Sequence, residues 1–121
     1  MVIRLRNATI DAIEDTEIKR LKLLRIVSKD EGAKLTLELP DALCDKMSVR
    51  DGIVVIVDSK PIARGEKSKL YAEGDIFKIG GNGNLEMVGA IGGLRVVLTL
   101  ANPTPAKKKM FAADKFYLML S

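Results

Sequence analysis

The sequence contains no histidine, no tryptophan and no glutamine, and its one cysteine is Cys44. Without histidine, the chain cannot build a Ser-His-Asp triad, a Cys-His pair or a zinc site with imidazole ligands. A single cysteine forms no intramolecular disulfide, and an unpaired thiol suits a reducing compartment. We therefore expect no catalytic residue, no bound metal and no cofactor in this chain.

Long apolar runs are missing as well. Arg4 and Arg6 interrupt the first apolar stretch before it could act as the core of a signal peptide. No stretch approaches the roughly 20 apolar residues that a membrane-spanning helix requires. We therefore expect a cytoplasmic protein. A length of 121 residues without a linker predicts a single domain, residues 1–121.

The charged residues give only mild guidance about partners. The net charge of +4 is compatible with an acidic protein partner or with nucleic acid, but it decides between neither. Scarce amides with abundant lysine and glutamate are typical of heat-adapted proteins. The acidic residues of the first quarter lie in predicted turns or on solvated faces, so we expect ordinary surface groups at Asp11, Glu14, Asp15, Glu17, Asp30 and Glu31.

Alternation of apolar and polar residues with a period of two dominates the chain and predicts β-strands. The clear alternating runs lie at residues 34–39, 85–91, 94–100 and 116–120. The run at 53–57, IVVIV, is β-branched and apolar throughout, which predicts a strand covered on both faces. Pro40 fits the first turn of a short helix over about residues 41–47.

The first quarter of the chain admits two interpretations. Residues 2–6 alternate as a strand does, whereas residues 8–24 place Ile10, Ile13 and Leu21 near one face of a helix. The sequence leaves that choice open for residues 1–20. For residues 20–27 we favour a strand, because its apolar residues precede a turn.

Glycines mark two connections between strands. Residues 80–84, GGNGN, predict a hairpin, since they lack the Gly-Lys-Ser/Thr ending and the following helix of a phosphate-binding loop. Gly92 and Gly93 predict a barrel corner or bulge, or a place where a partner's backbone lies close. Seven or eight short strands with one short helix together predict an all-β, closed or nearly closed barrel, since closure removes unpaired strand edges.

Four segments, in this order, resemble the small barrel subunit that archaeal and eukaryotic RNA polymerases share. They are residues 24–26 (LRI) with 34–39 (KLTLEL), residues 51–55 (DGIVV), residues 69–78 (KLYAEGDIFK), and residues 91–98 (IGGLRVVL) with 117–120 (YLML). The Gly-Gly-Leu of residues 92–94 is the most specific element, and the resemblance covers about residues 20–121. The connection between Asp58 and Lys69 is shorter than in the eukaryotic members, which favours an archaeal origin.

The resemblance implies an eight-stranded antiparallel barrel related to the OB-fold. Together with the short helix predicted above, we expect a single OB-like barrel domain over residues 1–121, of which residues 1–20 match the family poorly. The resemblance also implies a non-catalytic structural subunit of the archaeal DNA-directed RNA polymerase, docked on the largest subunit. The active-site aspartates and magnesium of such an enzyme belong to other subunits. We expect the docking contacts at the glycine corner (Gly92, Gly93 and Leu94) and along a strand edge near Tyr71 and Phe77.

The alternative is a stand-alone OB-type protein that binds single-stranded nucleic acid, which would stack bases on exposed aromatic side chains. Only five aromatic residues are present, and we expect most of them in the core; they are Tyr71, Phe77, Phe111, Phe116 and Tyr117. Lys107, Lys108 and Lys109 predict a solvated loop, with contact to a polyanion as the second possibility.

Overall fold

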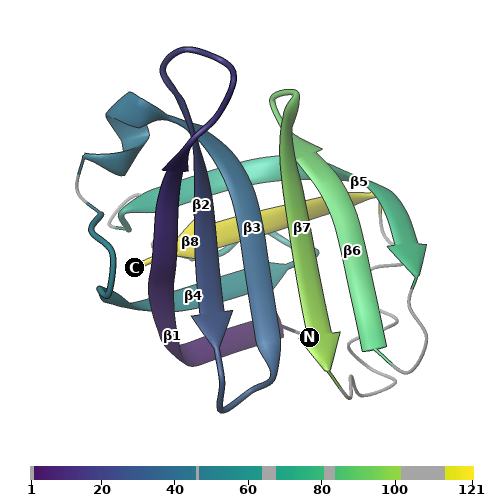
Figure 1. Ribbon diagram of the computed structural model, residues 1–121. Helices are drawn as coiled ribbons and strands as arrows, with labels where there is room; N and C mark the ends of the chain where they lie inside the picture. Colours follow the sequence, from purple (N-terminus) through teal and green to yellow (C-terminus); the bar gives the residue numbers. More distant parts are fainter. Residues whose placement is uncertain (1, 46, 64–67, 81–83, 102–113) are drawn as a thin grey trace.

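The computed structural model describes residues 2–45, 47–63, 68–80, 84–101 and 114–121, which form a closed barrel of eight antiparallel strands (Figure 1). The order around the barrel is β1-β2-β3-β7-β6-β5-β8-β4, and β4 pairs with β1 to close it. The elements are β1 (Val2–Asp15), β2 (Leu21–Ser28), β3 (Ala33–Pro40), the 3-10 helix η1 (Asp41–Cys44), β4 (Gly52–Asp58), β5 (Leu70–Gly80), β6 (Asn84–Ile91), β7 (Leu94–Ala101) and β8 (Lys115–Leu120). The predicted all-β, OB-like barrel is confirmed.

The helical interpretation of residues 8–24 is wrong, because β1 continues to Asp15 and β2 begins at Leu21. Two β-bulges in β1 explain the misleading pattern. One extra residue lies between Leu5 and Ala8 in the pairing with β4, and another between Ile10 and Ala12 in the pairing with β2. An extra residue changes the spacing of inward-facing side chains from two to three, which imitates a helical period.

The same bulges allow β1 to pair with two neighbouring strands. Its first half pairs with β4 and its second half with β2, and the strand bends between them (Figure 1). Bulges increase the local twist and bend of a strand. The bend in β1 therefore joins the two ends of the sheet and closes the barrel.

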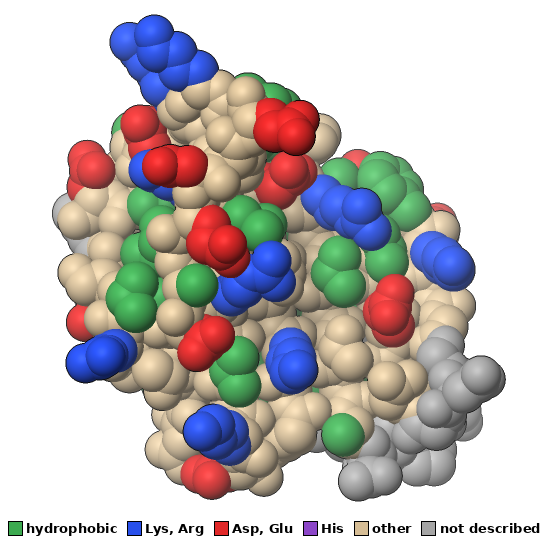
Figure 2. Space-filling model, in the orientation of Figure 1, with side chains coloured by type: hydrophobic (Ala, Val, Ile, Leu, Met, Phe, Trp, Pro, Cys, Tyr) green, Lys and Arg blue, Asp and Glu red, His purple; other side chains and the backbone are tan. Residues whose placement is uncertain are grey.

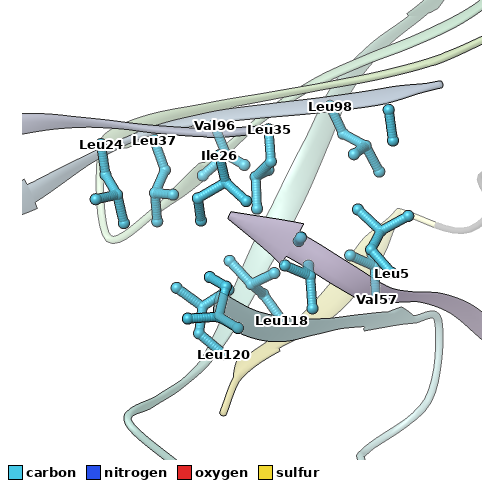
Figure 3. Close-up of a cluster of buried hydrophobic side chains, with 14 of the residues drawn as sticks. Leu5, Leu24, Ile26, Leu35, Leu37, Val57, Val96, Leu98, Leu118 and Leu120 are labelled. Atoms are coloured by element: carbon cyan, nitrogen blue, oxygen red, sulfur yellow. The ribbon is translucent and has the colours of Figure 1, made fainter. Parts of the chain in front are cut away.

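The interior is filled almost entirely by aliphatic side chains. In Figure 3, side chains of β2, β3 and β7 point down toward those of β1, β4 and β8. The twelve largest fully buried side chains are Phe116, Ile3, Leu5, Ile10, Leu24, Ile26, Leu35, Leu37, Met87, Leu98, Leu118 and Leu120. Burial of each such side chain contributes roughly 1.5–3 kcal/mol to folding.

Phe116 is the only aromatic residue among these fully buried side chains, and its ring lies against bare backbone. A Cβ atom added at Gly74 would lie 2.5 Å from Cζ of Phe116, and one at Gly89 would lie 2.9 Å from Cε1 of the same ring. Gly74 pairs directly with Phe116, and β5 passes from β8 to β6 one residue later, at Asp75. The glycines thus leave room for the ring where β5 changes partners.

Two expectations about β4 and its approach need correction. The predicted helix over residues 41–47 is a single 3-10 turn, Asp41–Cys44, which buries Cys44 at one end of the barrel. The strand at 53–57 is not covered on both faces. Its inward residues are buried, whereas the outward residues Val54 and Ile56 are only half-buried. An isolated barrel has no second layer to cover an outer face.

Replacing Gly89 by alanine should lower the stability of the barrel by about 1–3 kcal/mol. The new methyl group would lie 2.5 Å from the carbonyl oxygen of Asp75, and backbone cannot move aside without disturbing the pairing of β5 with β6. Gly80→Ala is the matched control, because a Cβ atom there meets nothing within 4 Å. Urea denaturation of both variants measures the difference, and equal stabilities would contradict this account of the Phe116 contact.

Candidate docking surface

Phe77 is the most exposed large hydrophobic residue of the described chain, with 71% of its surface accessible. It lies in a third β-bulge, where the pairing of β5 with β6 gains one residue between Ile76 and Lys78. Ile76 lies opposite Gly89 and Ile79 opposite Met87, both on the inward face of β6. The two residues between them, Phe77 and Lys78, therefore both point outward.

An exposed phenylalanine stands out on this surface. A closed barrel buries its apolar side chains internally, so an outward aromatic ring gains nothing from folding of the isolated chain. Aromatic side chains are enriched among the residues that contribute most to protein–protein binding. The bulge at Phe77 therefore marks a candidate contact point.

Tyr71 has a different environment from Phe77. Its ring stacks on that of Tyr117, with centroids 6.4 Å apart and an angle of 21° between the planes. Its hydroxyl oxygen accepts a hydrogen bond of 3.0 Å from the backbone N–H of Ile62. Only 37% of Tyr71 is exposed. We infer that Tyr71 mainly holds the connection between β4 and β5 against the outer face of the barrel.

The structure does not bring Tyr71 and Phe77 together. Six residue steps along extended strand separate them, which is about 20 Å. β5 pairs with β8 over Leu70–Asp75 and with β6 over Asp75–Gly80, so among the described residues each half of the strand has a strand partner on one side only. Phe77 is the more exposed of the two aromatic side chains.

Gly92 and Gly93 form the two-residue turn of the β6–β7 hairpin, rather than a corner or bulge inside a strand. Ile91 and Leu94 pair across the turn, and the φ angles of the glycines are +57° and +85°. Two positive φ values are typical of a type I′ turn, which favours Asn or Gly in these positions. A Cβ atom at either glycine would meet nothing within 4 Å, so the conformation explains both glycines. Leu94 is half-buried beside them.

An outward-facing row that the sequence pattern does not reveal crosses five strands. Thr36 of β3 lies opposite Val97 of β7, Val97 opposite Val88 of β6, and Val88 opposite Lys78 of β5, beside Phe77. On β2, Arg25 lies opposite Thr36, and Leu23 lies two residues further along, opposite Glu38. We call Leu23, Thr36, Val97, Val88 and Phe77 the cross-strand strip. Figure 2 shows this face, with hydrophobic side chains spread across it and a group where β5 passes behind β6.

A hollow lies over one half of the strip, where β3 and β7 separate. Their ladder ends at the pair Leu37–Val96. At the next step the backbone N–H of Arg95 donates instead to Oε1 of Glu38, at 2.9 Å. The hollow is lined by Leu23, Thr36, Glu38, Arg95 and Val97. A partner side chain could enter the outer surface here without displacing a strand.

Charged side chains of both signs border the strip. Glu38, Asp75 and Glu86 carry negative charge, and Lys34, Lys78 and Arg95 carry positive charge. Arg25, which lies directly opposite Thr36 on this face, pairs with Glu14. The described outward residues of β2 and β3 include no aromatic side chain. These outward residues therefore provide no aromatic platform on which single-stranded bases could stack.

An ion pair joins β5 and β8 on the outer surface. Nζ of Lys115 donates to Oε1 of Glu73 at 3.0 Å. The hydrogen bond and charge of Glu73 raise the pKa of the Lys115 ammonium above its usual value. Both side chains are largely exposed, so the pair adds little to stability.

The remaining sequence-based expectations concern the lysine loop, the predicted hairpin, metal binding and membrane-spanning helices. Lys107, Lys108, Lys109 and Phe111 lie outside the described residues, as do residues 81–83 of the predicted hairpin, although β5 and β6 pair antiparallel on either side. Within the described ranges, no three acidic or cysteine side chains lie close enough to hold a metal ion. Among the same residues, no helix is long and apolar enough to cross a membrane.

Replacing Gly93 by valine should destabilise the hairpin by about 1–2 kcal/mol, because a β-branched residue is strained at φ +85°. Gly92→Asn is the control, since asparagine is favoured at the first position of a type I′ turn. Thermal denaturation compares the two variants. A Gly93→Val protein as stable as Gly92→Asn would show that the positive φ is not what requires glycine.

Cys44 should react slowly with thiol reagents in the folded protein. It is 8% exposed, and burial raises the pKa of its thiol, so less thiolate is present at any given pH. At pH 8 we expect Ellman's reagent to react at least about tenfold more slowly with the native protein than with the chain in denaturant. Equal rates would mean that this end of the barrel opens readily.

No protein-family model matches this chain, and no curated protein matches it. Among solved structures, it is similar to the cytoplasmic molybdate-binding protein ModG, crystallised with molybdate bound. The two share 13% sequence identity, the alignment covers 100% of this chain and 89% of that chain, and the TM-score is 0.40. At this level of similarity, the comparison assigns neither a family nor a ligand to this chain.

Proposed function

We propose that this chain is a non-catalytic structural subunit of an archaeal DNA-directed RNA polymerase, docked on the largest subunit of that enzyme in the cytoplasm. The proposal rests on the sequence resemblance together with the surface of the barrel. The resembling segments fall on β2, β3, β4, β5, β7 and β8, and the Gly-Gly-Leu segment forms the β6–β7 turn. Catalysis would belong to other subunits, and this chain would contribute binding surface.

One observation carries the docking role: the ring of Phe77, 71% exposed, in the bulge of β5. The bulge turns two consecutive residues outward, so that a cation, Lys78, lies beside the aromatic ring. An aromatic anchor with a charged neighbour is a common composition for the centre and rim of a protein interface. A rigid barrel can hold this anchor in place without cost in ordering a loop.

The proposed assembly is tested by affinity purification of the tagged chain from its native host. We expect the large polymerase subunits to elute with it, because a stable contact would bury about 800 Å² on each side. Elution without any polymerase subunit would contradict the proposal. Salt-sensitive binding of the purified chain to a single-stranded oligonucleotide would instead support the nucleic-acid-binding alternative.

Phe77→Ser should weaken association with the polymerase by about 2 kcal/mol or more, which is about thirtyfold in Kd. The fold should be unaffected, since the ring is 71% exposed. Ile18→Ser is a matched control, because Ile18 is 63% exposed on the connection between β1 and β2. Titration of a polymerase preparation lacking the subunit measures both affinities. Loss of binding in Ile18→Ser alone would place the contact at the other end of the molecule.

A further inference from the structure

The last part of β5 has an edge along which, among the described residues, no second strand lies. β6 pairs with β5 over Asp75–Gly80, whereas β8 pairs with the other side of β5 over Leu70–Asp75. On the β8 side, the N–H of Ile76 still donates to the carbonyl oxygen of Asp114, at 2.8 Å. β5 then continues through Phe77–Gly80, which is about 13 Å of strand beyond this hydrogen bond (Figure 1).

The bulge in β5 turns the backbone N–H and C=O of Ile79 toward this open edge. Backbone groups of successive strand residues point to the two sides in turn, and those of Ile76 point to the β8 side. Without a bulge, Lys78 would be the next residue to point there. The extra residue between Ile76 and Lys78 shifts the alternation by one, so Ile79 takes that place. An unpaired donor and acceptor on an exposed edge are a template for another strand.

Exposed apolar side chains lie on both faces of this edge. Phe77 points outward and is 71% exposed. Ile79 lies opposite the inward-facing Met87, and yet 38% of Ile79 is exposed. A helix that packs on the barrel covers one face of the sheet, whereas an added strand carries side chains to both faces in turn. A strand is therefore the occupant that can cover both Phe77 and Ile79.

Lys78 makes a second copy of this chain an unfavourable occupant. If the edges of two copies paired antiparallel over the whole of Ile76–Gly80, the two Lys78 side chains would lie directly opposite each other. Like charges in opposed positions destabilise a strand pair. Among the described residues Lys78 has no ion-pair partner, and an acidic side chain on the added strand would supply one. The edge thus fits a strand of a different protein.

We infer that the edge of β5 over Phe77–Gly80 receives an extended strand of the partner protein, with an acidic side chain near Lys78. The strand pairs with the backbone of Ile79 and covers the side chains of Phe77 and Ile79. In strand addition, backbone hydrogen bonds provide affinity and the alternate side chains provide specificity. This inference rests on the proposed docking function and names the element of the partner that docks.

The first test compares Ile79→Pro with Ile79→Ala in the polymerase association assay. Both variants lose the isoleucine side chain, but only proline also lacks the N–H that the added strand would accept. Proline is tolerated on an edge where the N–H faces away from the paired neighbour. We expect Ile79→Pro to bind about tenfold more weakly than Ile79→Ala. Equal affinities of the two variants would overturn the inference.

The second test reverses the charge at the edge. Lys78→Glu should weaken association at least about tenfold, because the new carboxylate would lie near the acidic side chain of the added strand. Lys34→Glu on β3 is the matched control, since Lys34 is also exposed and also lacks an ion-pair partner among the described residues. We expect Lys34→Glu to bind as the wild type does. Wild-type affinity in Lys78→Glu would contradict the acidic strand.

The third test identifies the occupant in the assembled polymerase. A benzophenone amino acid in place of Phe77 or, separately, of Ile79 should crosslink under light to the same short segment of one partner protein. Attachment to a second copy, to another part of the same chain or to nucleic acid would overturn the inference. If circular dichroism shows that Ile79→Pro does not fold, the crosslinking result decides in its place.

The outcomes separate this inference from the proposed function. Wild-type chain that fails to associate with the polymerase contradicts the proposed function itself. Association that survives Ile79→Pro and Lys78→Glu leaves that function standing and removes the edge of β5 from the interface.

Discussion

The contact of Phe116 with the bare backbone of Gly74 and Gly89 is the constraint on which the closed barrel depends most. β5 pairs with β8 up to Asp75 and with β6 from Asp75 onward, so the strand must bend where it changes partners. The ring fills the volume that two side chains would otherwise occupy, with 1% of Phe116 exposed. Glycine beneath an aromatic ring is a recurrent way to bend a strand without leaving a void. Without this bend, β5 could not link the two halves of the barrel.

Bulges provide the rest of the strand bending that closes the barrel. One extra residue at each of two places in β1 lets that strand pair with β4 and then with β2, so that the sheet has no free ends. The third bulge, in β5, has a consequence for the surface as well as for the fold. It turns Phe77 and Lys78 outward together. The bulge in β5 thus shapes both the barrel and the surface that we propose for docking.

Closure also restricts the kind of partner that the molecule can receive. Because β2, β3, β7 and β6 of the front face have a strand partner on both sides, recognition over these four strands uses side chains instead of backbone pairing. The available side chains are short, half-buried and arranged across the strands, and their charged neighbours balance one another. A barrel of this design is suited to a structural role, since its recognition surface is rigid before binding and loses little conformational entropy on assembly.

The alternation of leucine and valine determined most of the strands, since a period of two with one buried face leaves few other choices, and β3, β6, β7 and β8 lie where the pattern predicts them. The glycine pair at residues 92–93 marked a break between two strand patterns, but the expected corner or bulge is a hairpin turn in the structure. Only the tertiary structure decided that residues 8–15 belong to a long bent strand and that Phe77 points outward, because a bulge is defined by its partner strand. The cross-strand strip was equally hidden. Its members come from five strands between residues 23 and 97, and they meet only through registers that closure of the barrel sets.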